Sequence, residues 1–306
     1  MRRLLVNDCL TTIPGTRTFW HDLQEWFQME FVGGDYSTLA DKASVPAVDD
    51  ATLVIRNSAY FPPFESRCKQ ICLVQDILDG AARKIQDAVL LESHAAVFNS
   101  EFTYSKYKHK NGCVVPLPVD FALFEPGNPM GLQQMFGLPD GCVCWIGASQ
   151  GAAGHVKGFD IFLRIVRLNP DIPFVAVFKD AAPELAPPNM RCYVRLPQDE
   201  LARVIGACRA GLCTSRTESQ HLAGIEMGAC GLPMVAPPYG CYWKREDLPG
   251  ILAECSVEAL TNGVRAMLKA PGDPQAIREY WRKEFDRPVI KAAWEKLIGE
   301  VECSGR

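Results

Sequence analysis

The sequence predicts an α/β protein made of two Rossmann-like domains, each with a doubly wound parallel sheet. Short apolar runs typical of buried strands alternate with helical patterns along most of the chain. The 306 residues are 48% hydrophobic, which exceeds what one ordinary domain needs, and 22 prolines with 24 glycines supply many turns. We therefore expect one domain at 1–127, a second at 128–272 and a helical segment at 273–306.

The first domain contains the earliest of these alternating runs. Its expected elements are, in order, strand 4–6, helix 18–27, strand 30–32, strand 52–55, strand 70–74, helix 80–91, strand 95–99 and strand 113–115. The stretch 124–129, with two prolines and a glycine, reads as a linker to the second domain.

The pattern restarts after this linker and then gives way to helices. The expected elements are strand 143–147, helix 160–168, strand 174–178, strand 190–194, helix 198–207, strand 210–213, helix 220–230 and strand 234–236. Gly231 and Pro233 end the last of these helices. The segment 273–301 starts with Asp-Pro and is broken at Arg287-Pro288, which predicts two helices.

Charge, hydropathy and cysteine usage exclude several classes of protein. A formal net charge of −4 argues against nucleic-acid binding mainly through phosphate neutralisation. No apolar run of eighteen residues occurs and the chain does not start like a signal peptide, so we expect a cytoplasmic protein without an integral membrane segment. The thirteen cysteines are scattered and read as free thiols. Two close pairs, 68 with 72 and 142 with 144, lack a second pair or a histidine cluster, so no metal site is predicted.

One basic cluster stands out in the first domain. Residues 106–110 include three lysines and a histidine, with Tyr104 beside them. Two interpretations are open. The cluster is either a solvated loop between a helix and a strand, or a patch that meets an acidic acceptor, a lipid headgroup or nucleic acid.

The most informative run is 211–237, in which Glu218 and Glu226 stand eight residues apart around a helix start. The turn 214–219 follows a buried strand and precedes a helix, where free N–H groups and the helix dipole favour an anion such as a diphosphate. Glu226 lies two turns deeper, within reach of a sugar hydroxyl. Because carboxylates accept hydrogen bonds from hydroxyls, the spacing suits a nucleotide sugar. The alternative is an ordinary strand, turn and helix with two solvated glutamates.

This run resembles the signature of glycosyltransferase family four, which is Glu-Gly-Phe-Gly, four further residues, Glu, and a small-residue run ending Gly-x-Pro-Val-Val-Ala. The matching positions are Glu218, Leu222, Glu226, Gly228 or Ala229, Cys230, Gly231, Pro233, Val235 and Ala236. Ser219, Gln220 and His221 depart from Gly-Phe-Gly. The resemblance implies a retaining enzyme of the GT-B fold, with two Rossmann-like domains facing a cleft and the last helices crossing back to the first domain.

The resemblance extends to both sides of the expected linker. The residues 118–120, 124 and 126 look like the family's Gly-Val-Asp and Phe-x-Pro element, with proline replacing the glycine. Gly147 and Lys157 look like the opening of the family's second domain, where an arginine after the glycine and the lysine hold the diphosphate. Ala148 replaces that arginine here. The N–H groups of the small-residue loop 147–154, Ser149 among them, or the side chain of Arg216 are possible replacements.

The first domain supplies two further candidates. Asp76 follows a strand where the family often carries histidine and aspartate, with Gln75 in place of the histidine. Asp76 is interpreted either as an acceptor-binding residue or base, or as a helix N-cap. Gly15 lies in the stretch 11–16, where the family places a small-residue turn against its substrates, and a plain turn is the alternative.

The resemblance thus implies transfer of a sugar from a nucleotide diphosphate sugar to a hydroxyl acceptor, with retention of configuration. It also implies that no metal or other cofactor is needed, and that the cleft closes to expel water. The residues implied as catalytic are Glu218, Lys157 and Asp76; those implied in binding the sugar donor are Glu226, Leu222, Ala223, His221, Gly147, Ser149, Arg216 and Gly15. The acceptor is a glycan, a lipid-linked molecule or modified nucleic acid. The alternatives are a nucleotide-sugar-binding protein without activity, or another GT-B enzyme such as a sugar epimerase or a phosphorylase.

Overall fold

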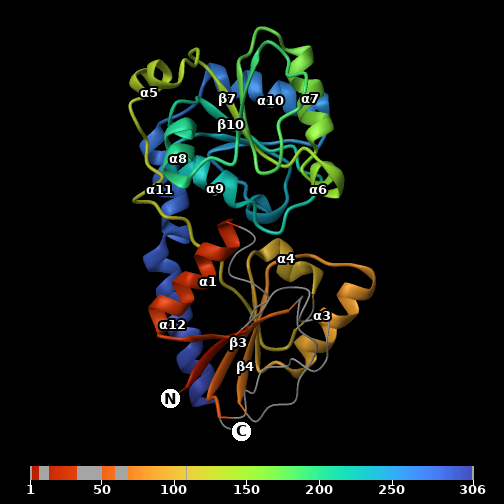
Figure 1. Cartoon of the computed structure of the whole chain (residues 1–306), viewed down its shortest axis with the longest axis vertical. Helices are drawn as coiled ribbons and strands as arrows, with labels where there is room; N and C mark the ends of the chain where they lie inside the picture. Colours follow the sequence, from red (N-terminus) through yellow and green to blue (C-terminus); the bar gives the residue numbers. More distant parts are fainter. Residues whose placement is uncertain (1, 7–13, 33–49, 59–67, 108, 305–306) are drawn as a thin grey trace. The chain divides into compact units, whose positions relative to one another are not determined.

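The computed structural model describes residues 2–6, 14–32, 50–58, 68–107 and 109–304. The chain divides into two compact units (Figure 1). Unit 1 comprises 1–118 and 288–306, and unit 2 comprises 119–287. Each unit is built on a six-stranded parallel sheet.

Unit 1 has the strand order β2-β1-β3-β4-β5-β6. Its elements are β1 (Arg3–Val6), α1 (Pro14–Phe27), β2 (Glu30–Val32), β3 (Leu53–Asn57), β4 (Lys69–Val74), α3 (Gly80–Glu92), β5 (Ala95–Phe98), α4 (Glu101–Lys106), β6 (Gly112–Val114) and α12 (Arg287–Cys303). The last helix is tied to this unit at two points. The rings of Phe19 and Trp294 lie 5.9 Å apart, and Arg3 forms an ion pair of 2.9 Å with Glu302.

Unit 2 has the strand order β12-β11-β10-β7-β8-β9. Its elements are α5 (Pro129–Phe136), β7 (Val143–Gly147), α6 (Gly151–Val156), α7 (Phe159–Leu168), β8 (Phe174–Phe178), β9 (Met190–Val194), α8 (Gln198–Gly206), β10 (Ala210–Leu212), α9 (Leu222–Ala229), β11 (Met234–Ala236), the 3₁₀ turn η2 (Gly240–Tyr242), β12 (Gly250–Leu252), α10 (Val257–Lys269) and α11 (Pro274–Phe285). The chain adds β8 and β9 on one side of β7, and β10 to β12 on the other. The strand order therefore reverses between β7 and β10, the place where doubly wound sheets bind ligands.

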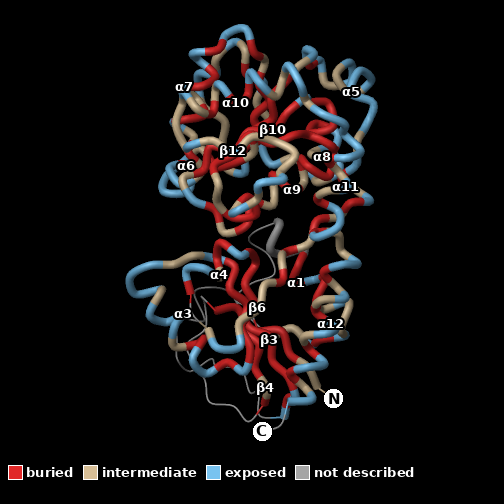
Figure 2. Tube along the Cα trace, turned by 180° about the vertical axis from the view of Figure 1, so that it is seen from behind, coloured by how far each residue is buried: buried red, intermediate tan, exposed pale blue. Residues whose placement is uncertain are grey.

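Both sheets are buried at their centres, and the strands of each unit carry mostly buried residues (Figure 2). In unit 2 the indole of Trp145 on β7 stacks on Phe162 of α7, with centroids 4.6 Å apart and planes 9° from parallel. On the other face, a Cβ added at Gly228 would overlap the ring of Trp281. A glycine at this point of α9 thus lets α11 pack closely against it.

The unit boundaries differ from the predicted domain boundaries in two places. Residues 119–127 lie in unit 2 because Phe121 and Phe124 are buried in its core, and Arg278 of α11 donates hydrogen bonds to both of their carbonyl oxygens. α11 also belongs to unit 2, and only α12 returns to unit 1. Both sheets and their helices have the predicted α/β class.

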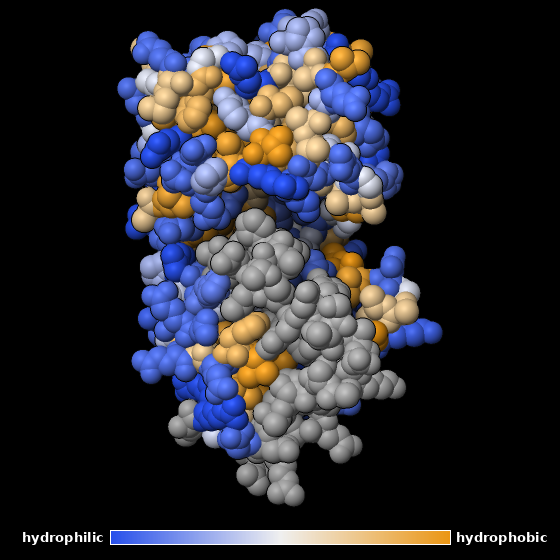
Figure 3. All heavy atoms as spheres, viewed as in Figure 1, coloured by the Kyte–Doolittle hydropathy of each residue, from blue (hydrophilic) through white to orange (hydrophobic). Residues whose placement is uncertain are grey.

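The surface of unit 2 seen in Figure 3 is mainly hydrophilic, with apolar groups scattered between polar ones. Several of the exposed apolar side chains are single residues on helices or loops, such as Leu168 and Leu185. Within the described ranges, none of the helices combines the length and the apolar character that a membrane span requires.

Candidate functional site

The predicted site residues of unit 2 gather where the strand order reverses. Two segments meet there: the loop after β7 that leads to Lys157, and the turn after β10. Thr214 joins them, since its hydroxyl accepts a hydrogen bond from the Trp145 indole at 2.9 Å and donates to the Lys157 carbonyl oxygen at 2.8 Å. Gly158 has a φ of +64°, and a Cβ there would overlap the carbonyl oxygen of Thr214. Glycine therefore allows the approach that places Lys157 beside the turn.

Replacing Gly158 with alanine should lower the free energy of unfolding by more than about 2 kcal/mol, because the methyl group would meet backbone and not a flexible side chain. Chemical denaturation measures this. Gly151→Ala is the matched control, since Gly151 also has a positive φ, of +55°, but open space around it. That variant should lose only about 1 kcal/mol, the conformational cost. Equal losses would show that the close approach at Thr214 is unimportant.

Lys157 and Glu218 form an ion pair at the centre of the site. The distance from Lys157 Nζ to Glu218 Oε1 is 2.6 Å, and the Ser215 hydroxyl donates to the same oxygen at 2.6 Å. Glu218 is only 8% exposed. Burial opposes its ionisation, but the charge of Lys157 and the hydrogen bonds from Lys157 and Ser215 outweigh burial, so the pKa of Glu218 lies below its usual value. The carboxylate is therefore ionised at neutral pH.

His221 lies where the family signature has its second glycine, and it keeps a glycine-like backbone with φ +69°. Its Nδ1 lies 2.8 Å from the hydroxyl of Tyr242, whose own ring packs edge-on against Trp281 at 6.0 Å. Burial lowers the pKa of His221 to about 4, a shift that nearby Glu218 only partly opposes. The imidazole is consequently neutral, and its contact with Tyr242 holds a backbone conformation that a non-glycine residue rarely adopts.

The helix predicted at 220–230 is present as α9, which begins two residues later than predicted and opens with Leu222 and Ala223. Their N–H groups belong to the first turn, where a helix has donors without intrahelical acceptors. Glu226, one turn further, is partly buried, and its carboxylate has no hydrogen bond or ion pair with any residue of the described ranges. Burial raises the pKa of Glu226 to about 7. This side chain is free to accept hydrogen bonds from an incoming hydroxyl.

The loop after Gly147 is already occupied by a carboxylate. The N–H of Ser149 donates to both oxygens of Asp180 at 3.0 Å, and the N–H of Gln150 donates to one of them at 2.9 Å. Burial opposes ionisation, but these backbone hydrogen bonds lower the pKa of Asp180 overall. Two of the loop N–H groups expected to replace the missing arginine thus hold an internal anion, and a phosphate would have to displace it.

Arg216, the other expected replacement, is also engaged. Its guanidinium pairs with both carboxylate oxygens of Asp160 at 2.8 and 2.7 Å and donates to the His155 carbonyl at 2.6 Å. Hydrogen bonding to Asp160 raises the pKa of Arg216. In this arrangement its charge is balanced by Asp160, so Lys157 is the cation at the turn that pairs with a predicted catalytic residue.

The predicted residues of unit 1 have varied surroundings. Asp76 is exposed just after β4, and its carbonyl oxygen accepts from the hydroxyl of Tyr107 at 3.1 Å. The N-cap of α3 is Asp79, so the alternative interpretation of Asp76 as the helix cap is wrong. Gly15 lies in the first turn of α1, and 7–13 fall outside the described residues. In the basic cluster, Lys106 Nζ lies 4.5 Å from the ring centroid of Phe102.

Four side chains of this site were missed by sequence reasoning: Cys213, Ser215, Asp180 and Tyr242. Cys213, Glu218 and His221 are all buried and bring three potential metal ligands within 4.8 Å of one another. The spacing Cys-x₄-Glu-x₂-His was visible in the sequence, although only the cysteine pairs were tested for metal binding. Asp180 and Tyr242 are contributed by distant segments, and nothing local in the sequence points to them.

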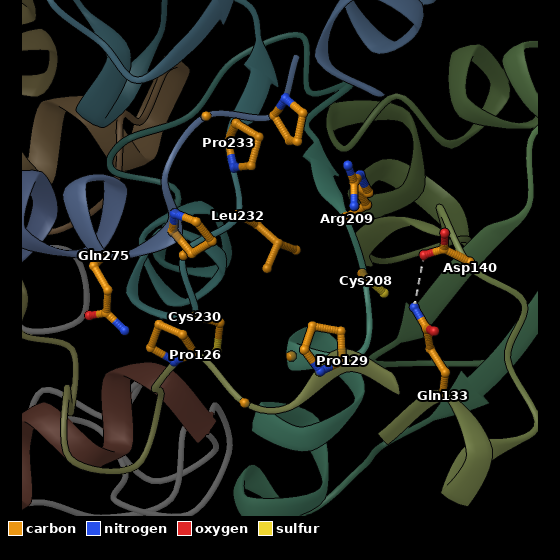
Figure 4. A pocket seen from close by; sticks show the side chains of 16 residues that line it. Pro126, Pro129, Gln133, Asp140, Cys208, Arg209, Cys230, Leu232, Pro233 and Gln275 are labelled. Carbon is orange, nitrogen blue, oxygen red and sulfur yellow. Dashed lines mark hydrogen bonds between the residues drawn. The ribbon is translucent and has the colours of Figure 1, made fainter. Parts of the chain in front are cut away.

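A separate cavity of about 450 Å³ lies near the amino ends of the strands of the same sheet, away from the Lys157–Glu218 pair. Figure 4 shows Arg209 and Pro233 on its wall, which immediately precede β10 and β11. The amide of Gln133 donates to Asp140 across the wall at 3.3 Å. Because the cavity is at the amino ends of the strands, it does not include the Lys157–Glu218 pair.

Comparison with known proteins gives the same assignment of fold. No family model matches the chain. D-inositol 3-phosphate glycosyltransferase of Segniliparus rotundus is 29% identical over 146 residues, which is 42% of this chain and 32% of that protein. The match thus spans about a third of the relative's length.

Among solved structures, sucrose-phosphate synthase from Thermosynechococcus elongatus has a TM-score of 0.80 at 13% identity, over 98% of this chain and 99% of the other. Anabaena HepE in complex with UDP-glucose has a TM-score of 0.76 at 13% identity, over 98% and 100%. With the two parallel sheets described above, these likenesses confirm the predicted fold. The chain therefore has the GT-B fold, and it resembles glycosyltransferases of family four.

Proposed function

We propose that this protein is a glycosyltransferase that takes a nucleotide diphosphate sugar and transfers its sugar, with retention of configuration, to an acceptor hydroxyl. The observation that carries the proposal is the Lys157–Glu218 ion pair at the point of strand reversal. It is followed by the first turn of α9 and by Glu226, whose carboxylate has no partner among the described residues. A cation and a helix N-terminus favour a bound diphosphate, and the two carboxylates can accept hydrogen bonds from the hydroxyls of the two sugars that flank it.

In this proposal each group has a separate task. Lys157 and the first N–H groups of α9 stabilise the negative charge that grows on the diphosphate as the glycosidic bond breaks. Glu218 accepts hydrogen bonds from the transferred sugar, and Glu226 accepts them from the ribose. The leaving phosphate takes the acceptor proton on the same face of the sugar, which gives retention without a strong protein base. Asp76 binds the acceptor hydroxyl, and no metal or other cofactor takes part.

The proposal is tested by thermal-shift titration against nucleoside diphosphates and nucleotide sugars, in buffer containing EDTA. A ligand that binds only the folded state raises the melting temperature with concentration. UDP-glucose enters the panel first because HepE was solved with it. A shift for one nucleotide family that disappears in Glu226→Ala supports the proposal. No shift with any nucleotide would contradict it.

The second candidate function is binding of the nucleotide sugar without transfer of its sugar. The observation that favours it is Asp180, whose carboxylate occupies the two N–H groups of the loop after β7. Product analysis with a bound nucleotide sugar separates the candidates. Free nucleoside diphosphate together with a new glycoside supports transfer, an altered sugar on the nucleotide indicates an epimerase, and stable binding without any product supports the second candidate.

Replacing Asp180 with asparagine should tighten the binding of a nucleoside diphosphate by about fivefold to tenfold, because a negative charge disappears from the site and an N–H group becomes available to phosphate. Isothermal titration calorimetry measures the change. Asp171→Asn is the control, since that carboxylate belongs to the same unit and pairs with Arg265. Equal affinities in wild type and Asp180→Asn would show that the phosphate binds away from this loop.

A further inference from the structure

The turn after β10 contains a buried group of side chains that the proposed reaction does not need in full. Cys213, Glu218 and His221 are 2%, 8% and 6% exposed, and one ligand atom of each lies within 4.8 Å of the others. Binding of a nucleotide sugar needs the carboxylate but gives no role to a thiol. Thiolate, imidazole and carboxylate together are the ligand types that zinc prefers.

The surroundings of two of these groups leave one atom of each available. Glu218 receives Lys157 and Ser215 on the same oxygen, Oε1, so Oε2 has no hydrogen-bond partner among the described residues. His221 meets the Tyr242 hydroxyl through Nδ1, which leaves Nε2. Metal-binding histidines and carboxylates are commonly held in this way through their second polar atom, which fixes the orientation of the ligand atom.

The distances suit a small tetrahedral ion after a modest contraction. With a Zn–S distance of about 2.3 Å and Zn–N and Zn–O distances of about 2.0–2.1 Å, ligand atoms lie roughly 3.3–3.7 Å apart. The present separations of up to 4.8 Å thus need shifts on the order of 1 Å. Magnesium and calcium select oxygen ligands, so a site with sulfur and nitrogen excludes them in favour of zinc and similar ions.

We propose that Cys213, Glu218 and His221 form a zinc-binding site that competes with the nucleotide sugar for Glu218. On binding, the Cys213 proton leaves to solvent, and a water molecule completes the fourth position. Lys157 stays on the other carboxylate oxygen, and its positive charge weakens the site. The competition rests on the proposed function, whereas the binding of the metal does not.

Cobalt spectroscopy on the full chain tests the metal site directly, because cobalt bound by a thiolate gives a near-ultraviolet charge-transfer band. One equivalent of Co²⁺ should produce this band, and Zn²⁺ should abolish it. Cys213→Ser should lose the band, while the control Cys255→Ser should keep it, since the Cys255 thiol donates to the carbonyl oxygens of Thr214 and Ser215 and is not one of the three clustered ligands. No band in the wild type, or a band retained in Cys213→Ser, would overturn the site.

A second pair of variants keeps the test decisive if Cys213→Ser does not fold. His221→Gln should also lose the band, and His155→Gln should keep it. Far-ultraviolet circular dichroism without metal checks that each variant is folded. If one of the two ligand variants fails to fold, the other decides the outcome.

The competition is measured separately. Zn²⁺ should raise the apparent Kd for UDP-glucose at least fivefold, and EDTA should reverse the effect. Unchanged affinity in the presence of Zn²⁺ would overturn the competition. A cobalt band in a protein that binds no nucleotide would instead leave the metal site standing and reject the proposed function.

Discussion

Lys157→Met is expected to lower turnover by about a hundredfold to a thousandfold, because it removes the cation that stabilises the departing diphosphate. The loss should appear mainly in kcat, since the charge on the diphosphate grows as the glycosidic bond breaks. Steady-state kinetics with the nucleotide sugar identified by thermal shift measures it. Lys157→Arg keeps a positive charge and should retain more activity than the methionine variant.

The same substitution should also destabilise the protein, and the two effects can be separated. It leaves the buried carboxylate of Glu218 without its ion-pair partner, which costs about 2 kcal/mol or more. In the double variant Lys157→Met, Glu218→Gln the buried charge is gone, so most of the stability should return while activity stays low. Full activity in a stable double variant would contradict the role proposed for the pair.

Much of the fold was predictable because buried parallel strands are short apolar runs. β2, β7, β8, β9 and β11 have the predicted bounds. The helix α10 was not predicted, although Ser256 before it caps the N–H of Ala259 and was visible as a start signal. α6 is different, because its Gly-Ala-Ala-Gly run has no apolar periodicity that would mark a helix.

The site was predictable only where its residues are close in the sequence. The positions of Glu218, Glu226 and the start of α9 follow from one strand, one turn and one helix. The bonding of these residues does not, because it depends on side chains from distant segments. Asp180 follows β8 and accepts hydrogen bonds from two N–H groups of the loop after β7. Asp160 of α7 forms an ion pair with Arg216. Such partners are set by the order of strands in the sheet, which single-sequence patterns do not give.

The second large effect concerns Glu226, whose pKa is raised by burial from 4.5 to about 7. The protonated form is therefore the one that the folded state favours. The stability linked to this proton is fully present below pH 4.5 and is lost as the pH rises to about 7 and beyond. Glu226→Gln removes the penalty, so the variant should exceed the wild type in stability by about 1–3 kcal/mol above pH 7, and the difference should vanish near pH 4.5.

Binding of the nucleotide should depend on the same proton in the opposite sense. Ribose hydroxyls donate best to an ionised carboxylate, so the affinity of the wild type for the nucleotide should rise as the pH increases from 6 to 8. Glu226→Gln should bind the nucleotide at least about tenfold more weakly, and its affinity should not change over this pH range. Urea denaturation and calorimetric titration across this range measure the two effects on the same samples. A variant that is less stable than the wild type at pH 8 would show that ionised Glu226 does not destabilise the folded protein. A variant that binds with the same pH dependence as the wild type would show that Glu226 is not the ribose ligand. A more stable protein that binds its nucleotide less well is the outcome expected of a charge kept for function at the expense of the fold.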